Sequence, residues 1–141
     1  MSSNKNEMPD KILKVKQDLR RLRKLANAIE AELRARQRIC ERLTYLRSIP
    51  SPSEEVRVEI IGCEYSISGL KLDAHIKEAS ELEGRYLAAI TQLDPLDRAI
   101  IIDGYMNGKP YWKIGRDIGY TERGIQKRVR IAIEKIAAEI Q

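Results

Sequence analysis

The sequence predicts an all-α protein, in which a long helical hairpin or coiled coil precedes a C-terminal trihelical domain with a helix-turn-helix. Two long segments, residues 10–48 and residues 70–93, place apolar side chains at alternating steps of three and four residues. In addition, residues 94–141 divide into three short helical segments that are separated by glycine and proline. Helical spacing therefore accounts for most of the chain.

The composition fits long, exposed helices better than a thick globular core. Of the 141 residues, 33% are charged and 5% are aromatic, and the net charge of +5 favours a polyanionic partner. No apolar run is long enough to cross a bilayer, and the first ten residues lack the apolar core of a signal peptide. The two cysteines, Cys40 and Cys63, have no metal-ligand spacing and indicate reduced thiols. We therefore expect a cytoplasmic protein without a membrane partner.

The first long helix is expected to span residues 10–48, after a disordered tail at residues 1–9. Its apolar positions follow a heptad pattern, with Arg36 as the exception. These positions are Ile12, Val15, Leu19, Leu22, Ala26, Ile29, Leu33, Cys40 and Leu43. At 1.5 Å per residue the helix would be roughly 58 Å long. A helix of this length needs a partner helix.

Two partners are available for this helix, namely residues 70–93 and the same helix of a second molecule. Residues 10–48 carry twelve basic and five acidic residues, whereas residues 53–94 carry four basic and nine acidic ones. These opposite charges favour an antiparallel hairpin within the chain. The second helix is shorter, and we expect the uncovered part of the first helix to contribute to a homodimer. Pro50 and Pro52 end the first helix, so residues 49–69 are expected to be a flexible linker with some extended structure.

The C-terminal segment, residues 94–141, carries its own helix boundaries. Asp94 is a favourable N-cap and Pro95 suits the first helical position. A second helix is expected from about residue 110 to residue 118. Gly119 provides the turn after it, and Thr121 caps the last helix. The aliphatic residues of the last two helices share one inward face, which consists of Ile114, Ile118, Ile125, Val129 and Ala132.

The outward face of the last helix carries side chains that can reach base edges and phosphates. The expected base-reading residues are Thr121, Glu122, Arg123, Gln126 and Lys127. The expected phosphate contacts are Lys109, Lys113, Arg116 and Arg130. Arg128 lies beside the buried stripe and is expected to pair with Asp103 or another acid. The alternative interpretation is an ordinary helical hairpin with a solvated basic face.

The C-terminal segment resembles a known family. Its residues Tyr105, Gly108, Trp112, Ile114, Gly119, Tyr120, Thr121, Ile125 and Ala132 are similar to the helix-turn-helix of phage-encoded ArpU/RinA-like late-transcription regulators. That domain is in turn similar to the promoter-reading C-terminal domain of sigma factors. The resemblance covers residues 94–137. It departs from the family at Gly124, inside the last helix, and at Gly115, where alanine is more usual and is expected to be nearly harmless. The resemblance implies a sequence-specific regulator of transcription that binds double-stranded DNA, activates late genes of a phage or mobile element and contacts host RNA polymerase.

Other chemistry is not indicated. His75 is the single histidine and is expected at the surface, and there is neither a phosphate-binding glycine loop nor a Cys/His metal cluster. We therefore expect no enzymatic activity, no cofactor and no metal. The basic run at residues 11–24 is interpreted as a solvated coiled-coil face rather than a DNA-contacting arm, because the apolar seam continues through it. Tyr105 and Trp112 are expected to pack the trihelical domain rather than to stack on bases.

Two other functions fit the same pattern. One is a DNA-packaging adaptor that resembles a terminase small subunit, although such proteins usually place the DNA-binding unit first. The other is a purely structural coiled-coil protein whose last helices contact proteins. Affinity for duplex DNA that falls steeply with salt would discriminate against the structural protein. A mass of many protomers would indicate the packaging adaptor.

Overall fold

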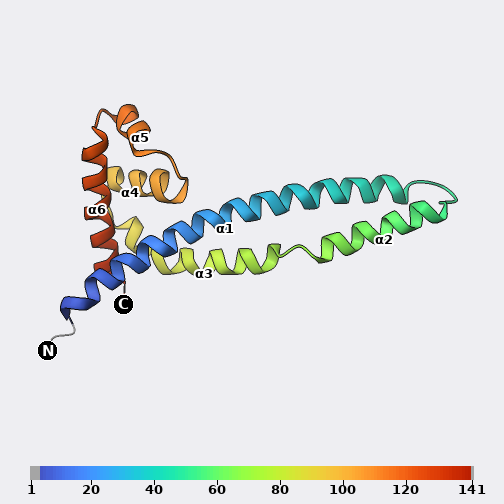
Figure 1. The fold of residues 1–141 in the computed structure, drawn as a ribbon, viewed down its shortest axis with the longest axis horizontal. Helices are drawn as coiled ribbons and strands as arrows, with labels where there is room; N and C mark the ends of the chain where they lie inside the picture. The colour runs from blue at the N-terminus through green and yellow to red at the C-terminus, as the bar shows by residue number, and fades with distance from the viewer. Residues whose placement is uncertain (1–3, 141) are drawn as a thin grey trace. The chain divides into compact units, whose positions relative to one another are not determined.

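The computed structural model describes residues 4–140, which fold entirely into helices and turns (Figure 1). This confirms the all-α prediction and the long first helix. The α-helices are α1 (Asn4–Arg47), α2 (Glu54–Ser68), α3 (Leu72–Thr91), α4 (Pro95–Ile101), α5 (Tyr111–Ile118) and α6 (Glu122–Glu139). A single π-helical turn, η1 (Ile102–Met106), continues α4. The chain divides into two compact units, one of which contains residues 26–77 and the other the segments 4–25 and 78–140.

Helix α1 begins before the predicted start at residue 10. It includes residues 4–9, which were expected to be a disordered tail, and it contains Pro9. Proline is tolerated best near the start of a helix, where few intrahelical hydrogen bonds are lost, and Glu7 lies in the first turn, where the helix dipole favours a negative charge. The rest of the predicted tail, residues 1–3, lies outside the described residues.

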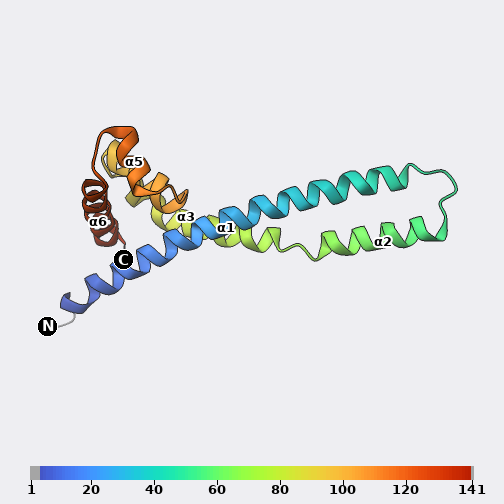
Figure 2. The same ribbon diagram turned by 45° about the horizontal axis from the view of Figure 1, so that its top comes forward.

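Helix α2 corrects the prediction of a flexible linker at residues 49–69. The side chain of Ser53 accepts a hydrogen bond from the Val56 amide and caps the helix, and two glutamates occupy the first turn. The β-branched residues suggested extended structure, but their spacing is also helical. Three of them and Cys63 form a half-buried face, which consists of Val56, Ile60, Cys63 and Ile67. In both views α2 lies beside the second half of α1 (Figures 1 and 2).

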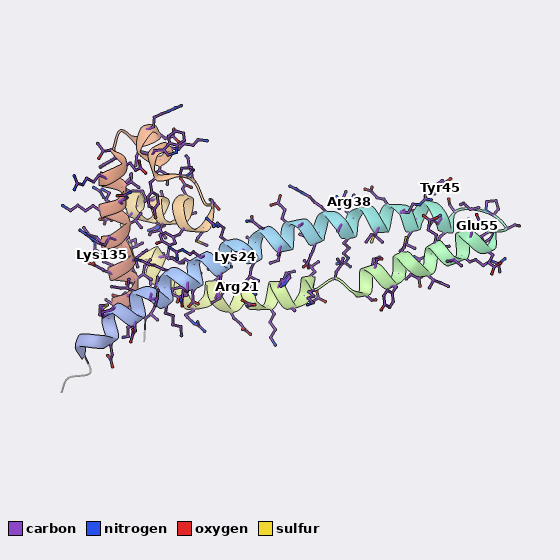
Figure 3. All side chains as sticks on the ribbon, in the orientation of Figure 1. Arg21, Lys24, Arg38, Tyr45, Glu55 and Lys135 are labelled. Atoms are coloured by element: carbon purple, nitrogen blue, oxygen red, sulfur yellow. The ribbon has the colours of Figure 1, made fainter. Side chains whose placement is uncertain are left out.

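The pairing of α1 with α2 removes the reason for which a dimer was expected. Arg42 donates to Glu59 at 2.7 Å and Arg47 donates to Glu64 at 2.9 Å, so the part of α1 that was predicted to overhang has a partner within the chain. Leu43 and Leu46 are buried on this side of α1. Arg38 and Tyr45, which are labelled in Figure 3, are exposed on the same half of α1.

The heptad seam predicted for α1 is confirmed at Val15, Leu19, Leu22 and Leu43, but at residues 25, 32 and 39 the inward position lies one residue earlier than predicted. Leu25 is buried in place of Ala26, and Leu33, which was expected to be inside, is 49% exposed. A straight α-helix drifts by about 20° per heptad against a strict seven-residue repeat, so a heptad read over many turns loses its register. Glu32 takes the inward position instead, and its Oε1 lies 2.8 Å from Nδ1 of His75. The expectation of a surface histidine is therefore wrong, because the side chain of His75 is three-quarters buried.

The unit formed by residues 4–25 and 78–140 has one continuous apolar core. Its buried residues come from α1, α3, α4, η1, α5 and α6, and include Leu19, Tyr86, Ile101 and Ile133. The hydroxyl of Tyr86 donates to the carboxylate of Asp18, and burial and this contact raise the pKa of Tyr86. The three C-terminal helices therefore share their core with the first part of α1 and the second part of α3.

Candidate nucleic-acid interface

The helix boundaries from α4 to α5 follow the sequence prediction in most respects. The predicted N-cap Asp94 precedes α4, but its side chain makes no capping hydrogen bond, while Pro95 occupies the first turn as expected. After η1, Gly108 adopts a left-handed conformation with φ of 71°, which ends the helical run. Tyr105 is buried, as predicted, and packs η1 into the core. Helix α5 then covers the predicted range.

The connection between α5 and α6 is a tight turn at Gly119. Its φ of 81° and ψ of 26° lie in the left-handed region, as expected for a glycine at a helix C-terminus. The amide of Tyr120 donates to the Gly115 carbonyl at 2.8 Å and closes the turn. Thr121 then caps α6 by accepting a hydrogen bond from the Gly124 amide at 3.0 Å. Both sequence predictions for this turn are confirmed.

Gly115 is buried at the point where α5 meets this turn. A Cβ atom built on it would lie 2.4 Å from the carbonyl oxygen of Tyr120. Because the neighbour is backbone, it cannot move aside as the end of a flexible side chain could. The prediction that alanine would be nearly harmless at Gly115 is therefore wrong.

Helix α6 presents two different faces. Ile125, Val129 and Ala132 are buried, as predicted. The exposed face carries a surface hollow of about 650 Å³, whose lining residues are Thr121, Arg123, Gly124, Gln126, Lys127 and Arg130. The structure thus brings four of the five expected base-reading residues together with Arg130. Glu122 is exposed in the first turn of the same helix but does not line the hollow.

Arg128 anchors α6 to α4. Its Nη1 donates to the Asp97 carboxylate at 2.9 Å, and Asp97 is buried. The guanidinium also lies 5.1 Å from the centroid of the Tyr120 ring. The hydrogen bond to Asp97 raises the pKa of Arg128. The expected partner was Asp103 or another acid, and Asp97 is that acid.

The residues expected to contact phosphates on and before α5 differ in whether they are already paired with a carboxylate. Lys113 and Arg116 are exposed. The Nζ atom of Lys109 instead lies 2.6 Å from the carboxylate of Asp117. This ion pair raises the pKa of Lys109 and lowers the pKa of Asp117. Lys109 would have to leave Asp117 before it could contact a phosphate.

Trp112 does not pack the domain together, which contradicts the prediction. Its side chain is 53% exposed. Successive residues of an α-helix turn by about 100°, so Trp112 points to the side opposite Ile114, which is one of the two buried residues of α5. A large exposed aromatic ring therefore lies on the same short helix as Lys113 and Arg116.

We compared the chain with protein families, with curated proteins and with solved structures, and found no match. Among the described residues, no group of three or more histidine, cysteine, aspartate or glutamate side chains is arranged to hold a metal ion. The helices of residues 4–140 also include none that is long and apolar enough to span a membrane.

Proposed function

We propose that this protein is a sequence-specific transcriptional regulator that binds double-stranded DNA, with α5, Gly119 and α6 acting as a helix-turn-helix. One observation carries the proposal. Arg123, Gln126 and Lys127 gather at an exposed hollow on the first half of α6, while the opposite face of this helix is buried. In a helix-turn-helix, the residues near the N-terminus of the second helix contact base edges in the major groove.

The side chains at this hollow suit the reading of bases. Arginine and lysine donate to guanine, and glutamine makes paired hydrogen bonds with adenine. The helix that carries them is fixed at its start by the Thr121 cap and in its middle by the ion pair between Arg128 and Asp97. A helix held in this way can enter a groove without losing much conformational freedom on binding.

Phosphate contacts would hold the reading helix in register. Lys113, Arg116 and Arg130 are exposed and can contribute them, and Lys109 can join them when it releases Asp117. Such contacts carry no sequence information, but they make the affinity strongly dependent on salt. Glu122 would accept from cytosine or exclude other bases at the edge of the site.

The resemblance to ArpU/RinA-like regulators suggests where the protein acts and with which partners. On this basis we propose that the protein acts in the cytoplasm of a bacterial host, at the nucleoid, as a late-gene activator of a phage or mobile element that contacts host RNA polymerase. A homodimer fits this role because it presents two reading helices to an inverted repeat. Support for the dimer comes from the outer face of α2, where Val58, Ile61 and Tyr65 are 62%, 65% and 80% exposed.

Selection of bound fragments from genomic DNA tests this function. The intact protein should enrich a common sequence near promoters, with half-sites spaced by whole turns of the double helix, roughly 10 bp or a multiple. On that sequence Arg123→Ala should lose affinity by roughly 1–3 kcal/mol and should relax the preference at one base step. Lys113→Ala should weaken specific and random duplexes alike.

Two results would reject the proposal. Equal losses for Arg123→Ala and Lys113→Ala on both duplexes would show that α6 does not read sequence. An affinity for duplex DNA that is absent, or indifferent to salt, would favour the structural coiled-coil protein instead. A specific site at the end of a phage genome, together with a ring-sized mass, would favour the packaging adaptor.

A further inference from the structure

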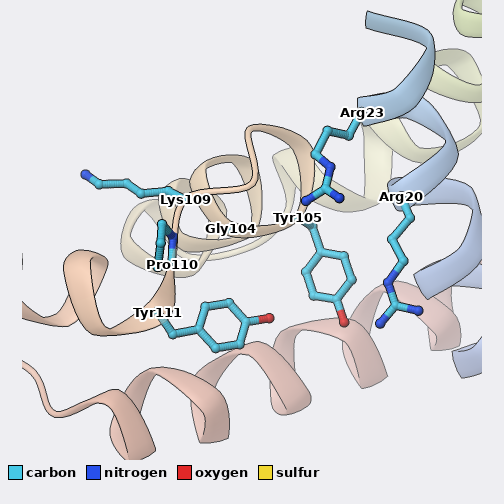
Figure 4. Close-up of a pocket in the computed structure, with 7 residues that line it drawn as sticks. All are labelled: Arg20, Arg23, Gly104, Tyr105, Lys109, Pro110 and Tyr111. Carbon is cyan, nitrogen blue, oxygen red and sulfur yellow. The ribbon is translucent and has the colours of Figure 1, made fainter. Parts of the chain in front are cut away.

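A second pocket lies away from the α6 hollow, between the first part of α1 and the segment that joins η1 to α5. Its volume is about 300 Å³, which is at the lower end of the range for sites that hold small ligands. The side chains of Arg20, Arg23, Tyr105 and Tyr111 line it, with Lys109 and Pro110 at its edge (Figure 4). All of these residues belong to the same compact unit.

The two arginines supply the charge of this pocket. In Figure 4 both guanidinium groups lie near the Tyr105 ring, whereas the side chain of Lys109 points away from the tyrosines. Arg20 lies 5.8 Å from the centroid of the Tyr105 ring. Within residues 4–140, neither Arg20 nor Arg23 has a carboxylate within ion-pair distance, although Arg21 between them is paired with Glu78. Two neighbouring cations therefore face the pocket without a compensating charge.

Two glycines give the pocket its shape. A Cβ atom on Gly108 would lie 2.8 Å from Nη1 of Arg23. The guanidinium group of Arg23 can therefore occupy this position only because residue 108 has no side chain. A Cβ atom on Gly104 would lie 3.0 Å from Cε1 of Tyr111. The backbone of η1 and of the loop after it thus approaches both Arg23 and Tyr111 closely. The turn at Gly119, which joins α5 to α6, does not depend on either of these contacts.

The hydroxyl groups add hydrogen-bond donors to the charge. Burial, followed by the neighbouring Tyr105, raises the pKa of Tyr111 to about 12, so this phenol keeps its proton at neutral pH. Guanidinium groups match the oxygens of a phosphate with paired hydrogen bonds. No carboxylate is found among the residues that line the pocket, which leaves an anion as the ligand that fits.

We propose that the pocket of Arg20, Arg23, Tyr105 and Tyr111 binds a phosphate group. Two sources of this group are possible. A phosphate of bound duplex DNA would add a contact from α1 to those from α5, and this source rests on the proposed function. A free phosphorylated compound would bind whether or not the protein reads DNA. The experiment separates these sources.

The test uses the full chain and two double variants with the same change in charge. Arg20→Gln/Arg23→Gln removes the two pocket cations. Lys14→Gln/Lys24→Gln is the matched control, because both lysines are exposed on α1 and neither lines the pocket (Lys24 is labelled in Figure 3). A third variant, Tyr111→Phe, removes one donor while keeping the ring, and it guards against misfolding of the arginine variant.

Each source has its own measurement. Pyrophosphate should raise the melting temperature of the wild-type protein and of the lysine control, but not that of the arginine variant, and Tyr111→Phe should show a reduced rise. For DNA, the slope of log affinity against log salt should fall by about 0.9 for each phosphate contact that is lost. This fall should be larger for the arginine variant than for the lysine control.

The outcomes are distinct. A difference between the arginine variant and the control in the pyrophosphate measurement alone identifies a free phosphate compound, and a difference in the DNA measurement alone identifies the duplex backbone. If the arginine variant behaves like the control in both measurements, the pocket is not a phosphate site. That result would leave the proposed function intact, since base reading depends on Arg123. If the wild-type protein binds no duplex DNA, the proposed function is rejected, while the pyrophosphate measurement still tests the pocket.

Discussion

Arg128 donates to the carboxylate of Asp97, and this contact joins the middle of the proposed reading helix to the start of α4. The side chain of Asp97 is only 7% exposed, whereas that of Arg128 is 37% exposed. The pair is therefore asymmetric. Removal of the arginine would leave a buried carboxylate without its cation, while the arginine itself would remain solvated if the carboxylate were lost.

Arg128→Ala should lower the free energy of unfolding by about 1–3 kcal/mol, because the Asp97 carboxylate would keep its burial and lose its charged donor. Denaturant unfolding measures this change. Arg130→Ala, on the exposed face of the same helix, is the control and should change the free energy by no more than about 0.5 kcal/mol. Addition of Asp97→Asn to Arg128→Ala should restore part of the loss. Equal effects of the two arginine substitutions would show that the ion pair does not hold α6.

Gly115→Ala should destabilise the protein by about 1–3 kcal/mol, because the new methyl group meets the Tyr120 carbonyl and forces α5 away from the turn. The control is Gly62→Ala on α2, where a Cβ atom would have nothing within 4 Å. That substitution should stabilise its helix by about 1 kcal/mol through propensity alone. Thermal unfolding of both variants compares the two signs. A Gly115→Ala protein with unchanged stability would contradict the close contact.

Substitutions of Gly119 separate backbone strain from steric contact, because a Cβ atom there would have nothing within 4 Å. Gly119→Val should lower the free energy of unfolding by roughly 1–3 kcal/mol, since its φ of 81° is unfavourable for a β-branched residue. Gly119→Asn should lose much less, because asparagine tolerates this conformation. The order should be Gly, Asn, Val both in melting temperature and in DNA affinity. The same loss for both variants would point to a cause other than the dihedral angle.

Serine substitutions on the outer face of α2 should weaken the proposed dimer. Ile61→Ser/Tyr65→Ser removes two highly exposed apolar side chains without disturbing the α1 contacts of this helix. Light scattering of the intact chain should then show a shift from dimer to monomer mass at micromolar concentration. Leu87→Ser is the control, because Leu87 is 63% exposed on α3. A monomer mass for the wild-type chain at the same concentration would exclude the dimer.

The Asp117 carboxyl should titrate below the ordinary aspartate range, because the ammonium of Lys109 stabilises its charged form. A depressed pKa contributes stability that is present above the unfolded-state pKa and is lost as the pH falls through the folded-state pKa. Carboxyl NMR should show the pKa of Asp117 rising toward its ordinary value in Lys109→Gln. Binding of duplex DNA to the wild-type protein should have the same effect if Lys109 moves to a phosphate. An unchanged titration in Lys109→Gln would show that the pair does not form.

Local rules of the sequence predicted the parts of this structure that depend on neighbouring residues. The turn at Gly119, the cap at Thr121 and the buried stripe of α6 all follow from spacing and side-chain chemistry within a few residues. The wrong prediction of a flexible linker at residues 54–68 also has a local cause. Alternating β-branched residues fit a strand as well as a helix, and the Ser53 cap was the feature that should have favoured the helix.

Contacts between distant segments could not be predicted in this way. The partner of Arg128, the clash at Gly115 and the exposure of Trp112 depend on how helices pack. The basic run at residues 11–24 was interpreted as one solvated face. The structure separates it into Arg21, which is paired with Glu78, and the pocket residues Arg20 and Arg23. A sequence pattern gives the direction of a side chain around its own helix, but not what lies opposite.

The division of the chain into residues 26–77 and a unit made of two separate segments has a consequence for synthesis. Residues 26–77 leave the ribosome early and can fold while translation continues. The first part of α1, by contrast, must wait with Val15, Leu19 and Leu22 uncovered until α3 and α6 have emerged. Since these contacts span most of the chain, their formation should be the slow step of folding. The nascent protein therefore carries a helix with an uncovered apolar side that a chaperone can bind, and it acquires its proposed reading helix after α1, α2 and α3 have emerged.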